Sequence, residues 1–118
     1  MAAVRPGSRC FLRTIEPVSE PYRVVDNPAE LRYEIYVEEE LAGYIRYRIE
    51  PGTVVLVHTD VEPRWEGGWV GRTLVREALE DLRARGLYAA PLCPFIIDFI
   101  GRNEEFRPLV VADPAVSD

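Results

Sequence analysis

The first half of the chain alternates apolar and polar residues in short runs that predict β-strands. Residues 22–25 and 31–37 are rich in β-forming side chains, and the odd positions of the second run are apolar. Strand character returns over 41–49 and 53–61, and the last run is the most apolar, so we place it centrally in the sheet. Turn residues separate the runs at 26–28, 38–40 and 51–52. One hairpin after another predicts an antiparallel sheet.

From residue 70 the apolar pattern changes to a helical period. An apolar residue recurs at every fourth position, at Val70, Leu74, Ala78 and Leu82. Charged residues fall between them, which predicts an amphipathic helix over 70–85 that ends before Gly86. Residues 87–92 predict a buried strand, and a strand–helix–strand unit favours parallel pairing. Pro94 suits the first turn of a second helix that ends at Arg102.

Together these elements predict an α/β (α+β) fold: a compact domain with antiparallel strands, then a β-α-β unit and a short C-terminal helix. A chain of 118 residues fits one such domain. We expect the domain to span 22–111. Residues 1–21, which contain three prolines, and residues 112–118 are expected to be flexible tails.

Composition excludes several kinds of function. The formal net charge of −6 argues against non-specific binding to nucleic acid. No apolar run approaches the roughly 20 residues of a membrane span, so no membrane partner is expected. All 14 basic residues are arginine, which excludes a Schiff-base or P-loop lysine and leaves arginine to bind any phosphate.

The cysteines and the histidine are too few and too scattered for a metal centre. Cys10 and Cys93 lie far apart, and His58 is the only histidine, so we expect neither a metal site nor a disulfide framework. We interpret both cysteines as free thiols in a reducing, cytoplasmic setting.

A glycine-rich loop, 66–72, lies between the strand 53–61 and the helix that follows it. Glycines at such a junction let backbone N–H groups approach an anion, and the start of a helix adds free donors and partial positive charge. A pyrophosphate is a suitable ligand, and Arg72 could reach it. Loop glycines also commonly form plain turns, so this loop alone leaves both interpretations open.

Several motifs accompany the loop. They are Val25-Asp26-Asn27-Pro28, Glu40-Leu41-Ala42-Gly43-Tyr44, His58-Thr59-Asp60-Val61, Leu74-Val75, Pro91-Leu92-Cys93-Pro94-Phe95 and Arg102-Asn103-Glu104-Glu105-Phe106. With them the chain resembles, over residues 23–110, the small single-domain N-acetyltransferase-like proteins of the GNAT superfamily. The resemblance implies an acetyl-CoA-dependent N-acyltransferase, a monomer or homodimer that acts on an amine of a small molecule or peptide. Exposed tyrosines 36, 44 and 47 would allow a dimer.

The resemblance also implies where the cofactor binds. Acetyl-CoA would lie where the strand ending near Val61 and the strand ending near Leu92 splay apart, and backbone N–H groups near 59–61 would polarise the thioester carbonyl. The residues implied for acetyl-CoA binding are Thr59, Asp60, Val61, Glu66, Gly67, Gly68, Trp69, Val70, Gly71, Arg72, Cys93, Pro94, Phe95, Phe99 and Arg102.

Cys93 and His58 are the catalytic candidates. A thiol near the start of a helix can have a lowered pKa, so Cys93 could act as a nucleophile or as an acid for the leaving CoA thiolate. The alternative is a small buried hydrophobic residue. His58 could take the proton of an incoming ammonium, or could be a hydrogen-bonded structural histidine.

The chain departs from the GNAT phosphate-loop pattern at Trp69, which stands where the pattern has its middle glycine. An indole pointing into the loop would displace a pyrophosphate, and Trp69→Gly would then bind CoA more tightly. Helical dihedrals at this position would instead turn the indole away and leave its N–H available. The departure keeps a second function class open, a non-catalytic CoA-binding or protein-interaction module with a degenerate phosphate loop.

Overall fold

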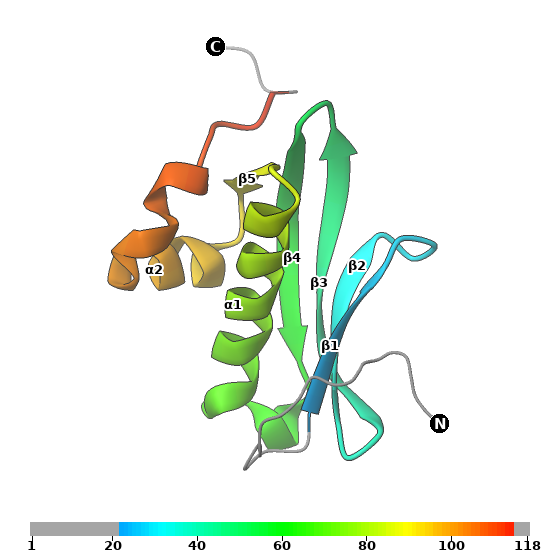
Figure 1. Cartoon of the computed structure of the whole chain (residues 1–118). Coiled ribbons are helices and arrows are strands. Elements are labelled where there is room, and N and C mark those ends of the chain that lie inside the picture. The colour runs from blue at the N-terminus through cyan, green and yellow to red at the C-terminus, as the bar shows by residue number, and fades with distance from the viewer. Residues whose placement is uncertain (1–21, 115–118) are drawn as a thin grey trace.

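The computed structural model describes residues 22–114, and its centre is a five-stranded sheet in the order β1-β2-β3-β4-β5 (Figure 1). The strands are β1 (Tyr22–Asn27), β2 (Arg32–Val37), β3 (Glu40–Glu50), β4 (Thr53–Val61) and β5 (Tyr88–Pro91). Neighbours from β1 to β4 pair antiparallel, whereas β4 and β5 pair parallel. The predicted antiparallel half followed by a β-α-β unit is confirmed.

Two helices cover one face of this sheet (Figure 1). Helix α1 (Trp69–Ala84) connects β4 to β5, and α2 (Pro94–Arg102) follows β5 with proline in its first turn, as the sequence predicts. Two 3₁₀ turns, at Pro63–Trp65 and Glu104–Leu109, were not predicted. Among residues 22–114, no helix is long and apolar enough to cross a membrane.

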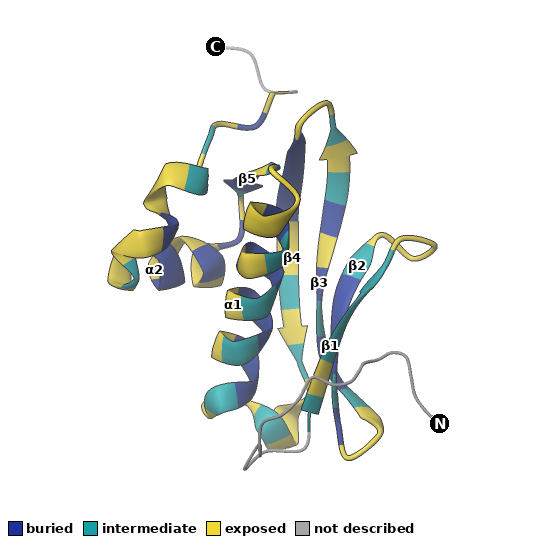
Figure 2. Cartoon of the chain, viewed as in Figure 1, coloured by how far each residue is buried: buried dark blue, intermediate teal, exposed yellow. Residues whose placement is uncertain are grey.

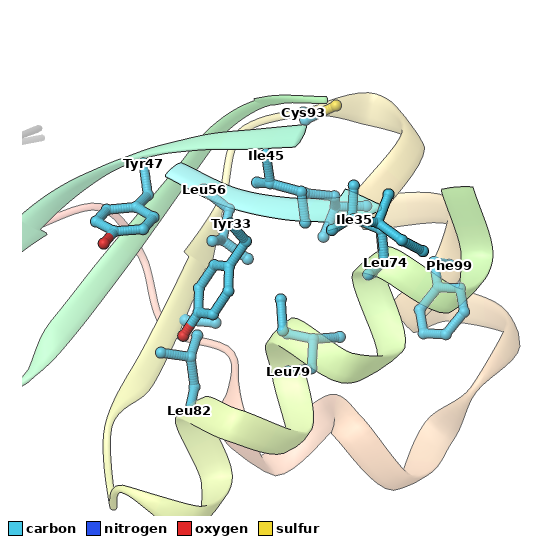
Figure 3. Close-up of a cluster of buried hydrophobic side chains, with 14 of the residues drawn as sticks. Tyr33, Ile35, Ile45, Tyr47, Leu56, Leu74, Leu79, Leu82, Cys93 and Phe99 are labelled. Carbon is cyan, nitrogen blue, oxygen red and sulfur yellow. The ribbon is translucent and has the colours of Figure 1, made fainter. Parts of the chain in front are cut away.

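The hydrophobic core lies between the helices and the sheet face that they cover. The side of α1 that faces the sheet is buried, and its outer side is exposed (Figure 2). Alternate residues of β2, β3 and β4 meet this side, because successive side chains of a strand point to opposite faces. The core includes Tyr33, Ile35, Ile45, Leu56, Leu74, Leu79, Leu82 and Phe99 (Figure 3).

Among the described residues, no helix covers the opposite face of the sheet, which we call the open face. The register places Glu34, Tyr44 and Asp60 side by side across β2, β3 and β4 on this face. Tyr47 was expected to be exposed, which is wrong: it is 5% exposed, and its hydroxyl donates to Asp26. The reason is strand alternation, which puts residue 47 on the helix-covered face together with Ile45.

The C-terminal segment is tied to the sheet beyond α2. The N–H of Val111 donates to the carbonyl of Ala89, and Arg48 donates to the buried carboxylate of Asp113. Contacts of the domain therefore continue past the expected boundary at 111. The expected tails at 1–21 and 115–118, including Cys10, lie outside the described residues.

Candidate functional site

Strands β4 and β5 part after a short parallel pairing. The pairing joins Thr53–Leu56 to Tyr88–Pro91, and its last hydrogen bond runs from the N–H of Leu92 to the carbonyl of Leu56. Strand β4 continues to Val61, so residues 57–61 have no strand partner on that edge within the described chain. This opening agrees with the expected splay near Val61 and Leu92.

A bulge accompanies the opening. Arg46 pairs with His58 and Tyr47 pairs with Leu56, so Val57 is an extra residue in β4. An extra residue shifts the alternation of the strand by one position. As a result the N–H of Thr59 points away from β3, to the side of the strand where its backbone can lower the pKa of the Cys93 thiol.

Val61 presents a second donor on the same edge. The N–H of Glu62 donates to the carbonyl of Ala42 in β3, so the neighbouring N–H of Val61 faces the opposite way. Thr59 and Val61 thus direct two backbone N–H groups into the opening, at the positions where the sequence predicted donors for a carbonyl oxygen.

A cavity of about 290 Å³ lies between the end of β4, the glycine loop and α2. It is lined by Thr59, Asp60, Val61, Trp65, Glu66, Gly67, Gly68, Gly71, Arg72 and Phe95. Trp65 is the one lining residue that the sequence analysis missed. No motif marked it, although its place directly before the glycine loop could have done so. Its indole Nε1 is buried and has no hydrogen-bond partner among the described residues.

The loop and the start of α1 leave backbone donors available. Gly67 has a φ of +79°, a conformation that favours glycine. The N-cap residue of α1 is Gly68, which has no side chain to accept hydrogen bonds from the first-turn N–H groups. The first turn also contains no acidic residue, so no carboxylate of the helix neutralises the positive end of its dipole. Arg72 has no carboxylate partner among the described residues, whereas Glu66 adds a negative charge to the rim.

Gly71 lets α1 approach α2 closely. A Cβ atom on Gly71 would lie 3.1 Å from Cζ of Phe95 and 3.5 Å from Cγ2 of Val61. The ring of Phe95 therefore packs against the helix backbone and forms one wall of the cavity. The neighbouring Val70 is buried in the core and does not line the cavity.

Trp69 adopts the helical alternative. It is the first residue of α1, and its ring centroid lies 5.7 Å from that of Tyr22 and 6.4 Å from that of Trp65. Trp69 is not among the residues that line the cavity. The indole therefore packs beside the loop instead of filling it.

Cys93 is the N-cap residue of α2 and is 6% exposed. Its sulfur lies at the edge of the core cluster and points away from the labelled apolar side chains (Figure 3). Burial raises the pKa of the thiol, but the hydroxyl of Thr59 and the backbone N–H groups of Ile96, Phe95 and Thr59 stabilise the thiolate, and the pKa ends below its ordinary value. The buried Thr59 hydroxyl makes no hydrogen bond of ordinary geometry with a described residue, so it is free to donate to a thiolate.

His58 is exposed on the open face, opposite Arg46. Its side chain makes no hydrogen bond or ion pair with another described residue, so the alternative of a hydrogen-bonded structural histidine has no support in the structure. Strand alternation places His58 and Asp60 on the open face, whereas Thr59 and Val61 point to the helix-covered face.

Six of the residues implied for cofactor binding do not line the cavity at the end of β4: Trp69, Val70, Cys93, Pro94, Phe99 and Arg102. Phe99 packs in the core against Phe106, and Arg102 pairs with Asp98. Both line a separate cavity of about 270 Å³, which adjoins the first because Arg72 and Phe95 line both. Pro94 is exposed in the first turn of α2. Their cofactor contacts stay predictions.

A larger cavity of about 340 Å³ lies between β1 and α1 and contains none of the predicted residues. Its carboxylates already have partners, since Asp26 and Asp81 both accept hydrogen bonds from Arg85. Residues 22–114 contain no group of three or more His, Cys, Asp or Glu side chains that could hold a metal ion.

Comparison with known proteins identifies the class. A profile of the GCN5-related N-acetyltransferase family matches residues 32–109, two thirds of the chain. The chain belongs to this family. No curated protein matches it.

Solved structures show the same fold at low sequence identity. A GCN5-like putative N-acetyltransferase from Staphylococcus aureus superposes with a TM-score of 0.57 and 19% identity over 81% of this chain and 93% of that one. The ribosomal-protein-S18-alanine N-acetyltransferase from Escherichia coli superposes with a TM-score of 0.54 and 15% identity, over 62% of this chain and 50% of that one. The PaiA N-acetyltransferase from Thermoplasma acidophilum, solved with coenzyme A, superposes with a TM-score of 0.51 and 19% identity. The match covers 62% of this chain and 49% of that one. The chain therefore spans about half the length of the last two.

Proposed function

We propose that the protein transfers the acetyl group of acetyl-CoA to the amine of a small molecule or peptide at the opening between β4 and β5. The observation that carries the proposal is the placement of an unpaired β4 edge, an uncapped helix start and a thiol of lowered pKa around one opening. A reducing, cytoplasmic setting would keep Cys93 as a thiol.

The residues around the opening suit a CoA molecule. The first-turn N–H groups of α1 and the guanidinium of Arg72 would bind its pyrophosphate. The unpaired edge of β4 would pair with the pantetheine amides as an added strand does. Phe95 would provide an apolar wall.

Acetyl-CoA supplies an acetyl thioester when bound. The N–H groups of Thr59 and Val61 are oriented to donate to its carbonyl oxygen. Cys93 would accept the acetyl group as a thiolate, or would hold a proton for the departing CoA sulfur. His58, on the open face, is placed to take a proton from the acceptor ammonium.

The proposed function is tested by incubating the protein with acetyl-CoA and a panel of amines, with mass spectrometric detection of N-acetylated products. Arg72→Ala should weaken CoA binding about tenfold or more, because one charge-assisted contact to phosphate is lost. Arg107→Ala is the matched control, since Arg107 is exposed outside the opening and donates to the carbonyl of Gly101. CoA binding without any acetylated product would support the non-catalytic alternative instead.

A further inference from the structure

The open face of the sheet carries a row of arginine and tyrosine side chains. The guanidinium of Arg23 lies 4.5 Å from the ring centroid of Tyr36, and that of Arg32 lies 4.7 Å from the ring centroid of Tyr44. Most arginines of this face are neutralised by a carboxylate: Arg23 by Glu39, Arg32 by Glu34, and Arg48 by Glu50 and Asp113.

Arg46 is the exception. It is exposed and forms no ion pair with any residue in 22–114. Its guanidinium instead makes a cation–π contact with the ring of Tyr44, 5.5 Å from the ring centroid. Asp60 is also exposed and unpaired within the same residues. Two opposite charges on one face thus remain without a partner.

The register brings these two charges together without joining them. Arg46 lies opposite His58, and Tyr44 lies opposite Asp60, so Arg46 and Asp60 are diagonal neighbours on the open face. Diagonal neighbours of this kind are about 7–8 Å apart, and their Cβ atoms are somewhat closer. No ion pair closes this gap, so it can hold a small molecule that carries both charges.

We propose that the acceptor is an α-amino acid, with its carboxylate on Arg46 and its ammonium on Asp60, beside the ring of Tyr44. This inference rests on the proposed function and names the substrate class of the same site. Arginine binds a carboxylate through two parallel hydrogen bonds, and an aromatic face provides a platform next to it.

The proposed acceptor site adjoins the site of acetyl transfer. Asp60 belongs to the open face by its register and also lines the cavity at the end of β4. His58 lies between Asp60 and the bulge at Val57, where β4 and β5 begin to part. An ammonium held by Asp60 is therefore next to the group placed to take its proton. The amine nitrogen bonds to the acetyl carbon as the carbon–sulfur bond of the thioester breaks. One proton of the ammonium goes to His58, and a second leaves with the CoA sulfur.

The test compares three amines, L-alanine, L-alaninamide and ethylamine, with wild-type protein and with Arg46→Gln. We expect kcat/KM for L-alanine to fall about tenfold in the variant, mainly through KM, because the lost contact binds the ground state and the transition state alike. The values for L-alaninamide and ethylamine, which lack the carboxylate, should not change. The ratio of variant to wild type removes the differences in basicity among the amines.

Two controls and a binding measurement complete the experiment. Arg23→Gln removes an arginine of the same face that is already paired, and should leave all three ratios near one. Arg46→Lys should recover part of the L-alanine activity, since the charge remains but the bidentate geometry does not. N-acetyl-L-alanine should shift the side-chain Nε–H resonance of Arg46 in wild-type protein.

The outcomes separate this inference from the function on which it rests. The inference is overturned, while acetyl transfer stands, if Arg46→Gln lowers kcat/KM equally for all three amines or for none of them. It is also overturned if both proteins prefer ethylamine to L-alanine. If wild-type protein acetylates no amine and binds no CoA, the proposed function fails and the inference fails with it.

Discussion

Cys93 combines burial with a lowered thiol pKa, two properties that usually oppose each other. Burial favours the neutral thiol, and here the N–H groups at the start of α2 and the Thr59 hydroxyl outweigh it. Of the two interpretations that the sequence leaves open, the packed thiol describes the burial of Cys93, whereas its reactivity stays a prediction that the lowered pKa supports.

Alkylation by iodoacetamide should report the Cys93 pKa. We expect the midpoint of the rate profile to lie below that of a free thiol measured in the same way, and to rise in Thr59→Val, which removes the hydroxyl donor. Cys93→Ala should unfold cooperatively and lose most acetyl transfer. Normal turnover by this variant would show that Cys93 only packs.

Glu34 is a buried carboxylate held by three donors. Asn27, Arg32 and Tyr36 all donate to it, at 3.0, 2.6 and 2.9 Å. Burial raises the pKa of Glu34, but the three hydrogen bonds together lower it by more. The pKa in the folded protein is therefore below its ordinary value. The carboxylate therefore contributes stability that is fully present above its unfolded pKa.

Glu34→Gln should make the protein less sensitive to acid. In wild-type protein the contribution of Glu34 is lost as the pH falls from about 4.5 through the lower folded pKa, because the unfolded chain binds the proton first. The variant should lose about 1.5–3 kcal/mol at pH 7, the range for a charged hydrogen bond, and less at pH 3. Urea unfolding at both pH values measures the difference. An equal loss at both would contradict the assignment.

At the scale of elements, periodicity predicted most of the architecture. The four-residue spacing from Val70 to Leu82 defines the buried side of α1, and Pro94 marks the start of α2. The bulge at Val57 could not be predicted, because it depends on which residue of β3 each residue of β4 meets. Trp65 was missed because no motif marks it, and its place directly before the glycine loop was the one signal in the sequence that it lies at the cavity.

The start of α1 depends on Trp69. Because its indole packs on Tyr22 and Trp65 and lies outside the cavity, Trp69→Gly should not tighten CoA binding. We expect a loss of about 1–3 kcal/mol of stability, from the lost aromatic contacts and the lower helix propensity of glycine. Calorimetric titration with CoA and thermal unfolding test the two parts. A gain in CoA affinity would mean that the indole enters the loop in solution.

At the scale of the whole molecule, one arginine connects three elements. Arg85, just after α1, donates to Asp26 of β1, to the Tyr33 hydroxyl of β2 and to Asp81 of α1 itself. Tyr33 in turn donates to Asp81, at 2.6 Å. This network joins the edge of the sheet to the last turn of α1, the helix whose first turn borders the opening between β4 and β5.

Coenzyme A should stabilise the whole domain, since a ligand that binds only the folded state shifts the unfolding equilibrium. At a CoA concentration about 100 times Kd the gain is about 2.7 kcal/mol. For a domain of this size each kcal/mol raises Tm by several degrees, so we expect an upward shift of about 10 °C. Arg72→Ala should reduce the shift and Arg107→Ala should not. The absence of any shift at millimolar CoA would contradict a CoA site.

The unpaired edge of β4 has a consequence for solubility. Free strand edges are templates on which another chain can add a strand and start aggregation. Here the free stretch is only 57–61, and it is interrupted by the bulge at Val57 and carries the polar residues His58 and Asp60. Short length, irregular twist and charge are the features that discourage edge-to-edge association. The opening proposed for the cofactor is therefore unsuited to a second copy of the strand.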